Sequence, residues 1–529
     1  MKKTIVSVII FSIIVLFTYS CTEVEANFTY SPTQPKAGER VSFTNTSTDG
    51  EKWEWSFGDG GTSTNENTSH IYKRAGTYTV RLRVDGKEKY TYMQRIQVAD
   101  TVPTIVRDSE TVNYYQEVTY SALVYNPNGL AVSYKWTFSD NAKSDSIING
   151  EAVSSTVKAV FTGKEKQEIV DLQLTVGETV FNVSDTVFVN DIELRSLYYA
   201  QKAGNIFRQR ILNVANEVEM PINTGVSSGK HPFNIILSND NLYIFDVGSE
   251  ATYSSGWGSS VAGDGNIRVM DIKTKAVAEI INNNGASSQY GFFGGFVDKD
   301  IVYWTDYSDF VYKTSTATRG ATFAHSDAAS TSPYYLTDVS KLGLTAGNFN
   351  GGIRLYDNTY FWAKGGTSGK GISKFRLSSD GQATKETDIL TDYAIRAFAI
   401  DEIYQRIYFS VTAPAEKIGL WTSNFNGGNA IRIDDSPMGS LEMYISGIVV
   451  DNLSRKVYWT YRSPEKEGFS PPSEGTWTKY YEEYPTHRTG IKQSELITFG
   501  NAQANAVEYF VLNVEAYGLA LDNVARKTN

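Results

Sequence analysis

The chain carries few side chains that could do metal, nucleophilic or acid–base chemistry. Its four histidines are His70, His231, His325 and His487, and its single cysteine is Cys21. These residues do not fall at spacings typical of zinc ligands, and the sequence contains no Gly-x-Ser-x-Gly turn and no phosphate-binding loop. The pattern favours a binding protein over an enzyme, with no metal and no cofactor.

Acidic segments are a weaker chemical signal. Asp434-Asp435 and Glu482-Glu483 are interpreted as solvated turns, and Asp264-Gly265-Asn266 is interpreted as a turn rather than a calcium loop. A hydrolase or lyase that uses His325 or His487 remains an alternative.

Aromatic side chains, by contrast, are abundant, with 34 Tyr, 26 Phe and 9 Trp. Exposed Trp and Tyr in loops can stack on the apolar face of a sugar ring or anchor a protein partner. The alternative is that these residues pack the loops against one another. The candidate ligand-binding residues are Tyr253, Trp257, Tyr290, Phe293, Tyr334, Tyr335, Trp477, Tyr480 and Tyr481.

The cysteine follows a segment typical of export signals. Met1-Lys2-Lys3 is positively charged, and an apolar run follows that is short for a membrane span, which needs about 20 residues. The residues before Cys21 resemble a bacterial lipobox, which implies cleavage before this cysteine and a lipid on its thiol. The sequence therefore predicts a signal peptide at 1–20 and a lipidated linker at 21–25. An ordinary signal peptide with an incidental cysteine is the alternative.

The acidic segment 22–25 resembles the weak surface-export signals of lipoproteins in some Gram-negative bacteria. It implies an outer-membrane lipoprotein at the cell surface that contacts the membrane through its lipid anchor alone. The net charge of −10 and the pI near 5.2 argue against nucleic-acid binding, which needs a basic surface.

Residues 26–99 contain alternating runs at 40–45, 53–57 and 77–84, which predict β-strands. This part resembles a PKD (polycystic kidney disease) domain, an immunoglobulin-like sandwich. The resemblance implies that Asp59 and His70 tie loops to strands by hydrogen bonds rather than bind a metal. The matching residues are Trp55, Phe57, Gly58, Asp59, Gly60, His70, Tyr72, Gly76, Tyr78 and Val80.

Residues 101–190 echo the first part. The segment 134–140 parallels 53–59, and 169–176 alternates apolar and polar residues. The Gly-Asp-Gly turn and the His-x-Tyr element are missing. We therefore predict a second, degenerate PKD-like sandwich, and expect the two sandwiches to act as spacers.

Residues 191–529 repeat a unit of about 40–60 residues, the period of propellers and arrays. Val302-Tyr303-Trp304-Thr305-Asp306 resembles the YWTD motif of the six-bladed β-propeller of the low-density lipoprotein receptor type. The predicted fold class is therefore all-β, with two tandem immunoglobulin-like (PKD-type) sandwiches followed by a six-bladed β-propeller. The motif and its degenerate copies lie at 197–199, 242–244, 302–306, 359–362, 407–410 and 457–460.

The ends of this region are expected to meet. The last motif, 517–522, reads as an inner strand that joins the first unit at 197–199 and closes the ring, which leaves no long exposed sheet edge. The loops between second and third strands and the connections between blades then open on one face. The long loops 248–264 and 462–490 belong to that face, and aromatic residues from several loops predict a recognition surface there.

The leading hypothesis is a cell-surface lipoprotein that binds an extracellular glycan through the long-loop face. PKD modules on bacterial lipoproteins often accompany polysaccharide capture, which is what the resemblance implies here. One alternative is a protein-interaction scaffold that binds an envelope protein, as YWTD propellers do in receptors. The other is a propeller hydrolase or lyase.

Overall fold

The computed structural model describes residues 24–528 except 213–218, 250–262, 284–290, 307–308, 324–329, 345–350, 366–369, 379–381, 436–444, 467 and 472–474. The predicted signal peptide and Cys21 lie outside the described residues. Within them, almost all regular structure is strand, which confirms the all-β prediction. The helices of this described part are too short and too polar to span a membrane. The chain divides into two compact units, Met1–Asp191 and Ile192–Asn529.

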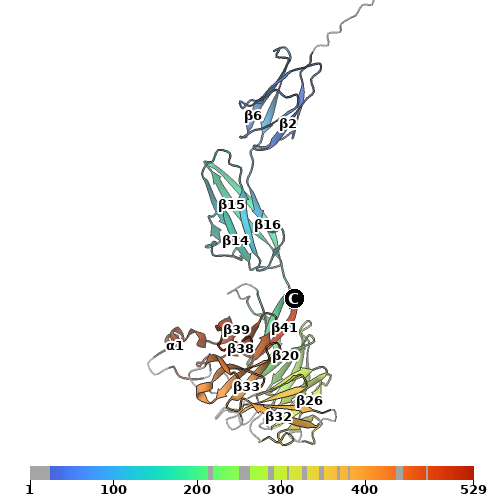
Figure 1. Ribbon diagram of the computed structural model, residues 1–529, viewed down its shortest axis with the longest axis vertical. Helices are drawn as coiled ribbons and strands as arrows, with labels where there is room; N and C mark the ends of the chain where they lie inside the picture. Colours follow the sequence, from blue (N-terminus) through green and yellow to red (C-terminus); the bar gives the residue numbers. More distant parts are fainter. Residues whose placement is uncertain are drawn as a thin grey trace, which may run out of the picture. The chain divides into compact units, whose positions relative to one another are not determined.

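The first part of unit 1 is a sandwich of two antiparallel sheets, and β2 and β6 belong to its two layers (Figure 1). The sheet orders are β1-β2-β5 and β4-β3-β6-β7. In β6, Val80, Leu82 and Val84 alternate inward and are fully buried, as the period of a strand requires. The strands are β1 (Phe28–Ser31), β2 (Arg40–Asn45), β3 (Trp53–Ser56), β4 (Thr62–Ser63), β5 (Thr68–Ile71), β6 (Gly76–Val84) and β7 (Thr91–Val98).

Two contacts fix this sandwich around its aromatic core. Trp55 is buried, and its Nε1 donates to a backbone carbonyl 2.9 Å away in the loop between β4 and β5. His70 Nε2 lies 2.7 Å from Asp59 Oδ2, and the imidazole stacks on Phe57 with ring centroids 4.3 Å apart. Asp59 also accepts the backbone N–H of Gly61 at 3.0 Å. The pair therefore ties the turn to β5, which confirms the hydrogen-bonding role predicted for His70 and Asp59.

The second sandwich repeats the strand pairing of the first. Its sheets have the orders β12-β14-β10-β8 and β13-β11-β15-β16-β9, so β8, β10, β11, β13, β14, β15 and β16 pair as β1 to β7 do. Trp136 on β11 likewise donates Nε1 to a backbone carbonyl, at 2.8 Å. The strands are β8 (Thr104–Arg107), β9 (Val112–Asn113), β10 (Glu117–Leu123), β11 (Val132–Thr137), β12 (Ala142–Lys143), β13 (Glu151–Ala152), β14 (Thr156–Phe161), β15 (Lys166–Val176) and β16 (Thr179–Asn190).

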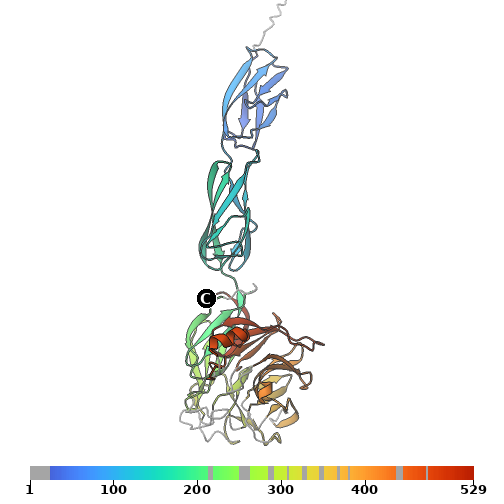
Figure 2. The ribbon, with the colours of Figure 1, turned by 90° about the vertical axis from the view of Figure 1, so that its left-hand side faces the viewer.

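The described residues of unit 2 form six sheets, antiparallel except where β27 pairs with β23 in parallel. Apart from β27 and the C-terminal strand β41, which returns to the first sheet, the sheets follow one another along the chain (Figures 1 and 2). The first contains β17 (Leu194–Gln201), β18 (Asn205–Arg210), β19 (Ile222–Ser227) and β41 (Ala516–Arg526). The second contains β20 (Pro232–Ser238), β21 (Asn241–Asp246), β22 (Asn266–Asp271), β23 (Val277–Asn282) and β27 (Ala321–Thr322). The third contains β24 (Gly294–Asp298), β25 (Ile301–Thr305), β26 (Phe310–Ser315) and β28 (Tyr335–Asp338).

The other three sheets keep the same order of strands. The fourth contains β29 (Ile353–Tyr356), β30 (Thr359–Lys364), β31 (Gly371–Leu377) and β32 (Ala383–Ile389). The fifth contains β33 (Ala394–Asp401), β34 (Arg406–Ala413), β35 (Gly419–Asn424) and β36 (Ile431–Asp435). The sixth contains β37 (Ile448–Asp451), β38 (Lys456–Tyr461), β39 (Gly490–Glu495) and β40 (Glu508–Leu512).

The inner strands of these sheets contact one another in a closed cycle. In order they are β41, β20, β24, β29, β33 and β37, and β37 contacts β41 again. The cycle closes because the C-terminal strand β41 pairs with β17, for example Leu521 with Leu197. Gly518 permits the close approach of β41 to β20, since a Cβ there would lie 3.0 Å from backbone atoms of β20. The expected pairing of 517–522 with the first repeat is present.

The repeated motif supplies the hydrophobic layers between neighbouring sheets. The six motifs lie on β17, β21, β25, β30, β34 and β38, the second strand of each sheet. Trp304, Trp362 and Trp459 are fully buried. A buried aromatic residue removes a large apolar area from water, so this repeat holds the sheets together and positions the loops.

Candidate ligand-binding site

The site lies where three connections of unit 2 meet at one edge of the sheets. In a four-stranded antiparallel sheet, the loop between the second and third strands opens at the same edge as the connection to the next sheet. Gln201 ends the second strand of the first sheet, the loop 462–489 follows the second strand of the sixth, and 513–515 connects β40 to β41. These segments line a common cavity.

A short helix organises the long loop. Helix α1 (Trp477–Glu483) begins after Thr476, whose hydroxyl accepts the backbone N–H of Lys479 at 3.3 Å. It ends at Tyr484, because the residue before Pro485 is disfavoured in the helical conformation. Trp477 and Tyr481 are four residues apart and share one face, whereas Tyr480 lies on another. The red coiled ribbon in Figure 2 is this helix.

One face of α1 forms the wall of an open cavity of about 560 Å³. The rings of Trp477 and Tyr481 stack with centroids 5.8 Å apart and planes 21° apart, and both side chains are partly exposed. The remaining lining is almost entirely polar. The lining residues are Gln201, Ser463, Glu465, Lys466, Trp477, Thr478, Tyr481, Arg488, Thr489, Asn513 and Glu515.

The charged side chains of the cavity make few contacts with other side chains, whereas Ser463 and Thr489 hydrogen-bond to each other. The Tyr481 hydroxyl donates to Glu465 Oε2 at 3.3 Å, and Lys466 Nζ lies 3.9 Å from Glu515 Oε2. Arg488 lies over the Tyr481 ring, 5.8 Å from its centroid. Burial raises the pKa of Tyr481, and Glu465 adds to that shift, so the phenol stays protonated and donates at neutral pH. The cavity thus offers an aromatic surface next to both hydrogen-bond donors and acceptors.

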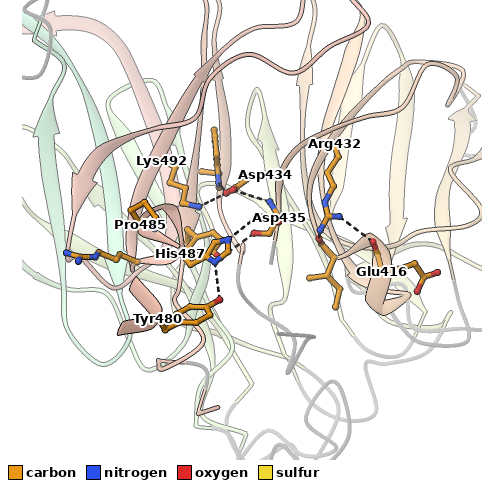
Figure 3. Close-up of polar contacts among 12 residues, drawn as sticks. Glu416, Arg432, Asp434, Asp435, Tyr480, Pro485, His487 and Lys492 are labelled. Atoms are coloured by element: carbon orange, nitrogen blue, oxygen red, sulfur yellow. Dashed lines mark hydrogen bonds and ion pairs between the residues drawn. The ribbon is translucent and has the colours of Figure 1, made fainter. Parts of the chain in front are cut away.

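The other face of α1 enters a hydrogen-bonded chain, shown in Figure 3. The Tyr480 hydroxyl lies 3.0 Å from His487 Nδ1, and His487 Nε2 lies 3.0 Å from Asp435 Oδ1. A carboxylate only accepts, so Nε2 carries the proton and the phenol donates to Nδ1. Burial raises the pKa of Tyr480 to about 12, which keeps that donor in place. The hydrogen bond from His487 lowers the pKa of Asp435.

A buried ion pair lies beside this chain (Figure 3). Lys492 Nζ donates to Asp434 Oδ2 at 2.8 Å, and the motif residue Trp459 donates its Nε1 to the same oxygen at 2.9 Å. The ammonium also lies 3.4 Å from the centroid of the Tyr461 ring. Burial lowers the pKa of Lys492, and Asp434 opposes that shift. We refer to Tyr480, His487, Asp435, Lys492 and Asp434 as the buried network, in which the Asp435 side chain alone is exposed.

The buried network joins the fifth sheet to the sixth and to α1. Asp434 and Asp435 end β36, Lys492 lies on β39, and His487 lies in the loop that follows α1. His487 is 2% exposed and Tyr480 is 6% exposed, so neither faces the cavity. The network therefore fixes the helix, and the helix presents Trp477 and Tyr481 to solvent.

The structure separates the predicted site residues into groups. It brings Trp477 and Tyr481 together on the cavity wall, while Tyr480 is turned inward. Phe293 was expected to be exposed but is 7% exposed, because it packs with Phe233, Val247 and Tyr517. Tyr253, Trp257, Tyr290 and His325 lie outside the described residues.

Tyr334 and Tyr335 occupy a different place from the one expected. They precede and begin β28, the fourth strand of the third sheet, so they follow a third-to-fourth-strand loop rather than a connection between sheets. That loop opens at the edge opposite the cavity. The Tyr335 hydroxyl donates to Asp338 at 2.8 Å, and Tyr334 packs against the core around Trp304. The expectation differs because β28 is a further strand of the third sheet and not the start of the next one.

Several residues of the site were missed in the sequence. Asp434 was interpreted as part of a solvated turn, but it is 6% exposed and holds Lys492. The charged lining residues are not among the predicted ones, although three of the four lie in the long loop 462–490; they are Glu465, Lys466, Arg488 and Glu515. The signal that could have found α1 is the helix-starting Thr476 followed by Pro485, with aromatic residues four apart between them. Among the described residues, no group of three or more His, Cys, Asp or Glu side chains could hold a metal ion.

A curated protein matches a short segment of the chain. A segment of 64 residues is 42% identical to the collagenase ColA of Bacillus cereus, and it covers 12% of this chain and 6% of that protein. The chain thus spans a small fraction of this relative.

Similarity to solved structures extends further along the chain but is low. A quinonprotein alcohol dehydrogenase-like protein of Bacteroides thetaiotaomicron has 12% identity and a TM-score of 0.35 over 80% of this chain and 98% of that one. A carbohydrate-binding module of the β-sandwich superfamily has 17% identity and a TM-score of 0.14 over 32% of this chain and 97% of the other. Residues 25–98 match the PKD domain family, and this part of the chain is a PKD domain.

Proposed function

We propose that this protein is a surface lipoprotein that binds an extracellular glycan in the cavity beside α1. In this proposal the lipid on Cys21 anchors the chain to the outer membrane, and the two sandwiches are spacers. The six sheets of unit 2 form a six-bladed β-propeller that presents the cavity, and the protein performs no catalysis.

The observation that carries the glycan proposal is the stacked pair Trp477 and Tyr481 on the cavity wall. A sugar ring has an apolar face that stacks on aromatic rings and hydroxyls that both donate and accept hydrogen bonds. The polar lining supplies acceptors such as Glu465 and Glu515, and donors such as Lys466 and Arg488. Concave sites with an apolar surface and a few convergent polar groups are the usual sites for small ligands.

The ring supports the proposal of a propeller with a binding face. Closure by β41 gives the loops a rigid base, and the cycle of inner strands is continuous. Loops on such a base carry function more often than the strands that hold them.

The test is isothermal titration calorimetry of the purified chain against a panel of oligosaccharides of six sugar units. We expect at least one of them to bind, and Trp477→Ala and Tyr481→Ala to weaken that binding at least tenfold. Phe499→Ala is the matched control. Phe499 is 70% exposed and lies in the loop between β39 and β40 of the sixth sheet, at the edge opposite the cavity. Binding that survives both cavity substitutions would place the site elsewhere. A stable stoichiometric envelope protein, captured without any oligosaccharide binding, would contradict the proposal in favour of a scaffold.

A further inference from the structure

We infer that the cavity is selective for neutral glycans and rejects acidic ones, with Glu465 and Glu515 as the residues that determine this specificity. The inference rests on the proposed function and names the ligand class of the same site. It follows from how the charged side chains of the cavity are balanced and paired.

Among the residues that the structure describes, four charged side chains line the cavity, two of each sign. Glu465 and Lys466 come from the long loop, Arg488 follows His487, and Glu515 precedes β41. Their formal charges sum to zero. Each positive group has a negative one nearby: Glu465 and Arg488 both contact Tyr481, and Lys466 Nζ lies 3.9 Å from Glu515 Oε2. Such a cavity has no net attraction for a ligand of either sign.

The charged groups nevertheless retain much of their hydrogen-bonding capacity. Lys466 Nζ and Glu515 Oε2 are 3.9 Å apart, which is within ion-pair range but too long for a hydrogen bond. In the part of the chain that the structure describes, the Arg488 guanidinium has no carboxylate within ion-pair range, and one of its contacts is the Tyr481 ring. A neutral sugar satisfies both kinds of group, because each hydroxyl can donate to a carboxylate and accept from a cation.

An acidic sugar gains less from the same groups. Its carboxylate or sulfate would be attracted by Lys466 and Arg488 and repelled by Glu465 and Glu515, since all four line the same cavity. The cost of removing the anion from water would then remain without compensation. The loop around the cavity does not change this balance, because residues 462–489 contain five Glu against four Lys and Arg. The net charge of −10 also opposes the approach of a polyanion.

The test compares neutral and acidic oligosaccharides of equal length on the full chain. Calorimetry would use cellohexaose, mannohexaose and xylohexaose as neutral probes and hexamers of galacturonate and mannuronate as acidic ones, at 20 and 300 mM NaCl. We expect the wild-type chain to bind a neutral hexamer at least tenfold more tightly than any acidic hexamer. We also expect less than a twofold change between the two salt concentrations, because no net charge is neutralised on binding.

The double variant Glu465→Gln/Glu515→Gln leaves a cavity with two positive charges. It is expected to bind acidic hexamers about tenfold more tightly than the wild type, in a salt-dependent way. Because both glutamates also accept from sugar hydroxyls, the neutral hexamer is expected to bind more weakly to this variant, and the ratio of neutral to acidic affinity should fall at least tenfold. The matched control Lys466→Met/Arg488→Met leaves two negative charges and should not gain acidic binding.

The outcomes separate this inference from the proposed function. If no hexamer of either class binds the wild-type chain, the proposed function is wrong, and the inference is overturned as well because it rests on that function. If the wild type binds an acidic hexamer at least as tightly as a neutral one, and Trp477→Ala abolishes that binding, the proposed function stands and the inference is overturned. A gain of acidic binding in the double variant that persists with Trp477→Ala would also overturn it, since the anion would then bind outside the cavity.

Discussion

The two faces of α1 show how one short element can serve two purposes. Towards the cavity, Trp477 and Tyr481 are partly exposed and make few directional contacts, including a hydroxyl that reaches Glu465 at 3.3 Å. Towards the protein, Tyr480 is buried and donates to His487, which in turn donates to Asp435. Tyr480 and Tyr481 are neighbours of the same type, yet one belongs to the core and the other to the surface.

The difference indicates that the buried face of α1 is the part that holds the helix in position. A seven-residue helix is too short to be stable alone, because the first turn costs more than its hydrogen bonds return. The buried network supplies the missing stability and fixes the position of α1 against the fifth and sixth sheets. The cavity face can then remain exposed without losing its shape, as a preorganised binding surface requires. The comparison therefore predicts that substitutions on the two faces have separable effects on folding and on binding.

The largest expected effect is on the buried face. Asp434→Ala would leave the ammonium of Lys492, which is fully buried, without its carboxylate partner. We expect unfolding free energy to fall by about 3–5 kcal/mol, the usual cost of breaking a buried ion pair by removing one partner. Urea denaturation followed by tryptophan fluorescence would measure it.

A matched double variant tests the cause. Asp434→Leu with Lys492→Met removes both charges at similar volume and is expected to recover most of the lost stability. A loss below 1 kcal/mol for Asp434→Ala alone would mean that water reaches the ammonium, which contradicts its burial.

The adjacent tyrosines allow the same chemical change on each face. Tyr480→Phe removes a buried hydroxyl and leaves His487 Nδ1 without its donor, so we expect a loss of about 1–2 kcal/mol in unfolding free energy. Tyr481→Phe removes a hydroxyl at the open cavity, and the loss should be below about 0.5 kcal/mol. Conversely, we expect Tyr481→Phe to weaken binding of a neutral oligosaccharide two- to threefold, because Glu465 loses the donor that orients it. Thermal unfolding would show the larger loss of stability in Tyr480→Phe. Calorimetry would show the loss of oligosaccharide affinity in Tyr481→Phe. Equal losses of stability would contradict the distinction between the faces.

Features of the fold and the site that depend on local sequence patterns could be predicted, whereas those that depend on contacts between distant residues could not. The strands carrying Val302-Tyr303-Trp304 and Val457-Tyr458-Trp459 were found because alternation and repetition are local signals, and the pairing of β41 with β17 followed from counting units. The inward turn of Tyr480 could not be found in this way. Only the helical period separates it from Tyr481, and seven residues are too few to establish that period. The burial of Asp434 depends on Lys492, which lies 58 residues away on another strand. Phe293 is buried by residues of two other sheets, Phe233 and Tyr517.

The smallest expected effect concerns Asp435 and pH. Its pKa is lowered in the folded chain by the hydrogen bond from His487, so the carboxylate stabilises the fold above its unfolded pKa of about 3.9 and loses that contribution as the pH falls through the lowered value. Asp435→Asn should therefore cost stability at neutral pH, by about 1 kcal/mol or less because the side chain is 52% exposed and partly screened.

The same variant should differ less and less from the wild type as the pH is lowered below about 4. Thermal unfolding of both proteins between pH 3 and 7 would measure the difference. Glu482→Gln, an exposed carboxylate on α1, is the control and should change stability by less than about 0.5 kcal/mol. A difference for Asp435→Asn that is constant over this pH range would show that the carboxylate acts by its shape alone. Charge attraction between the fifth and sixth sheets would then come from Lys492 and Asp434 rather than from the histidine.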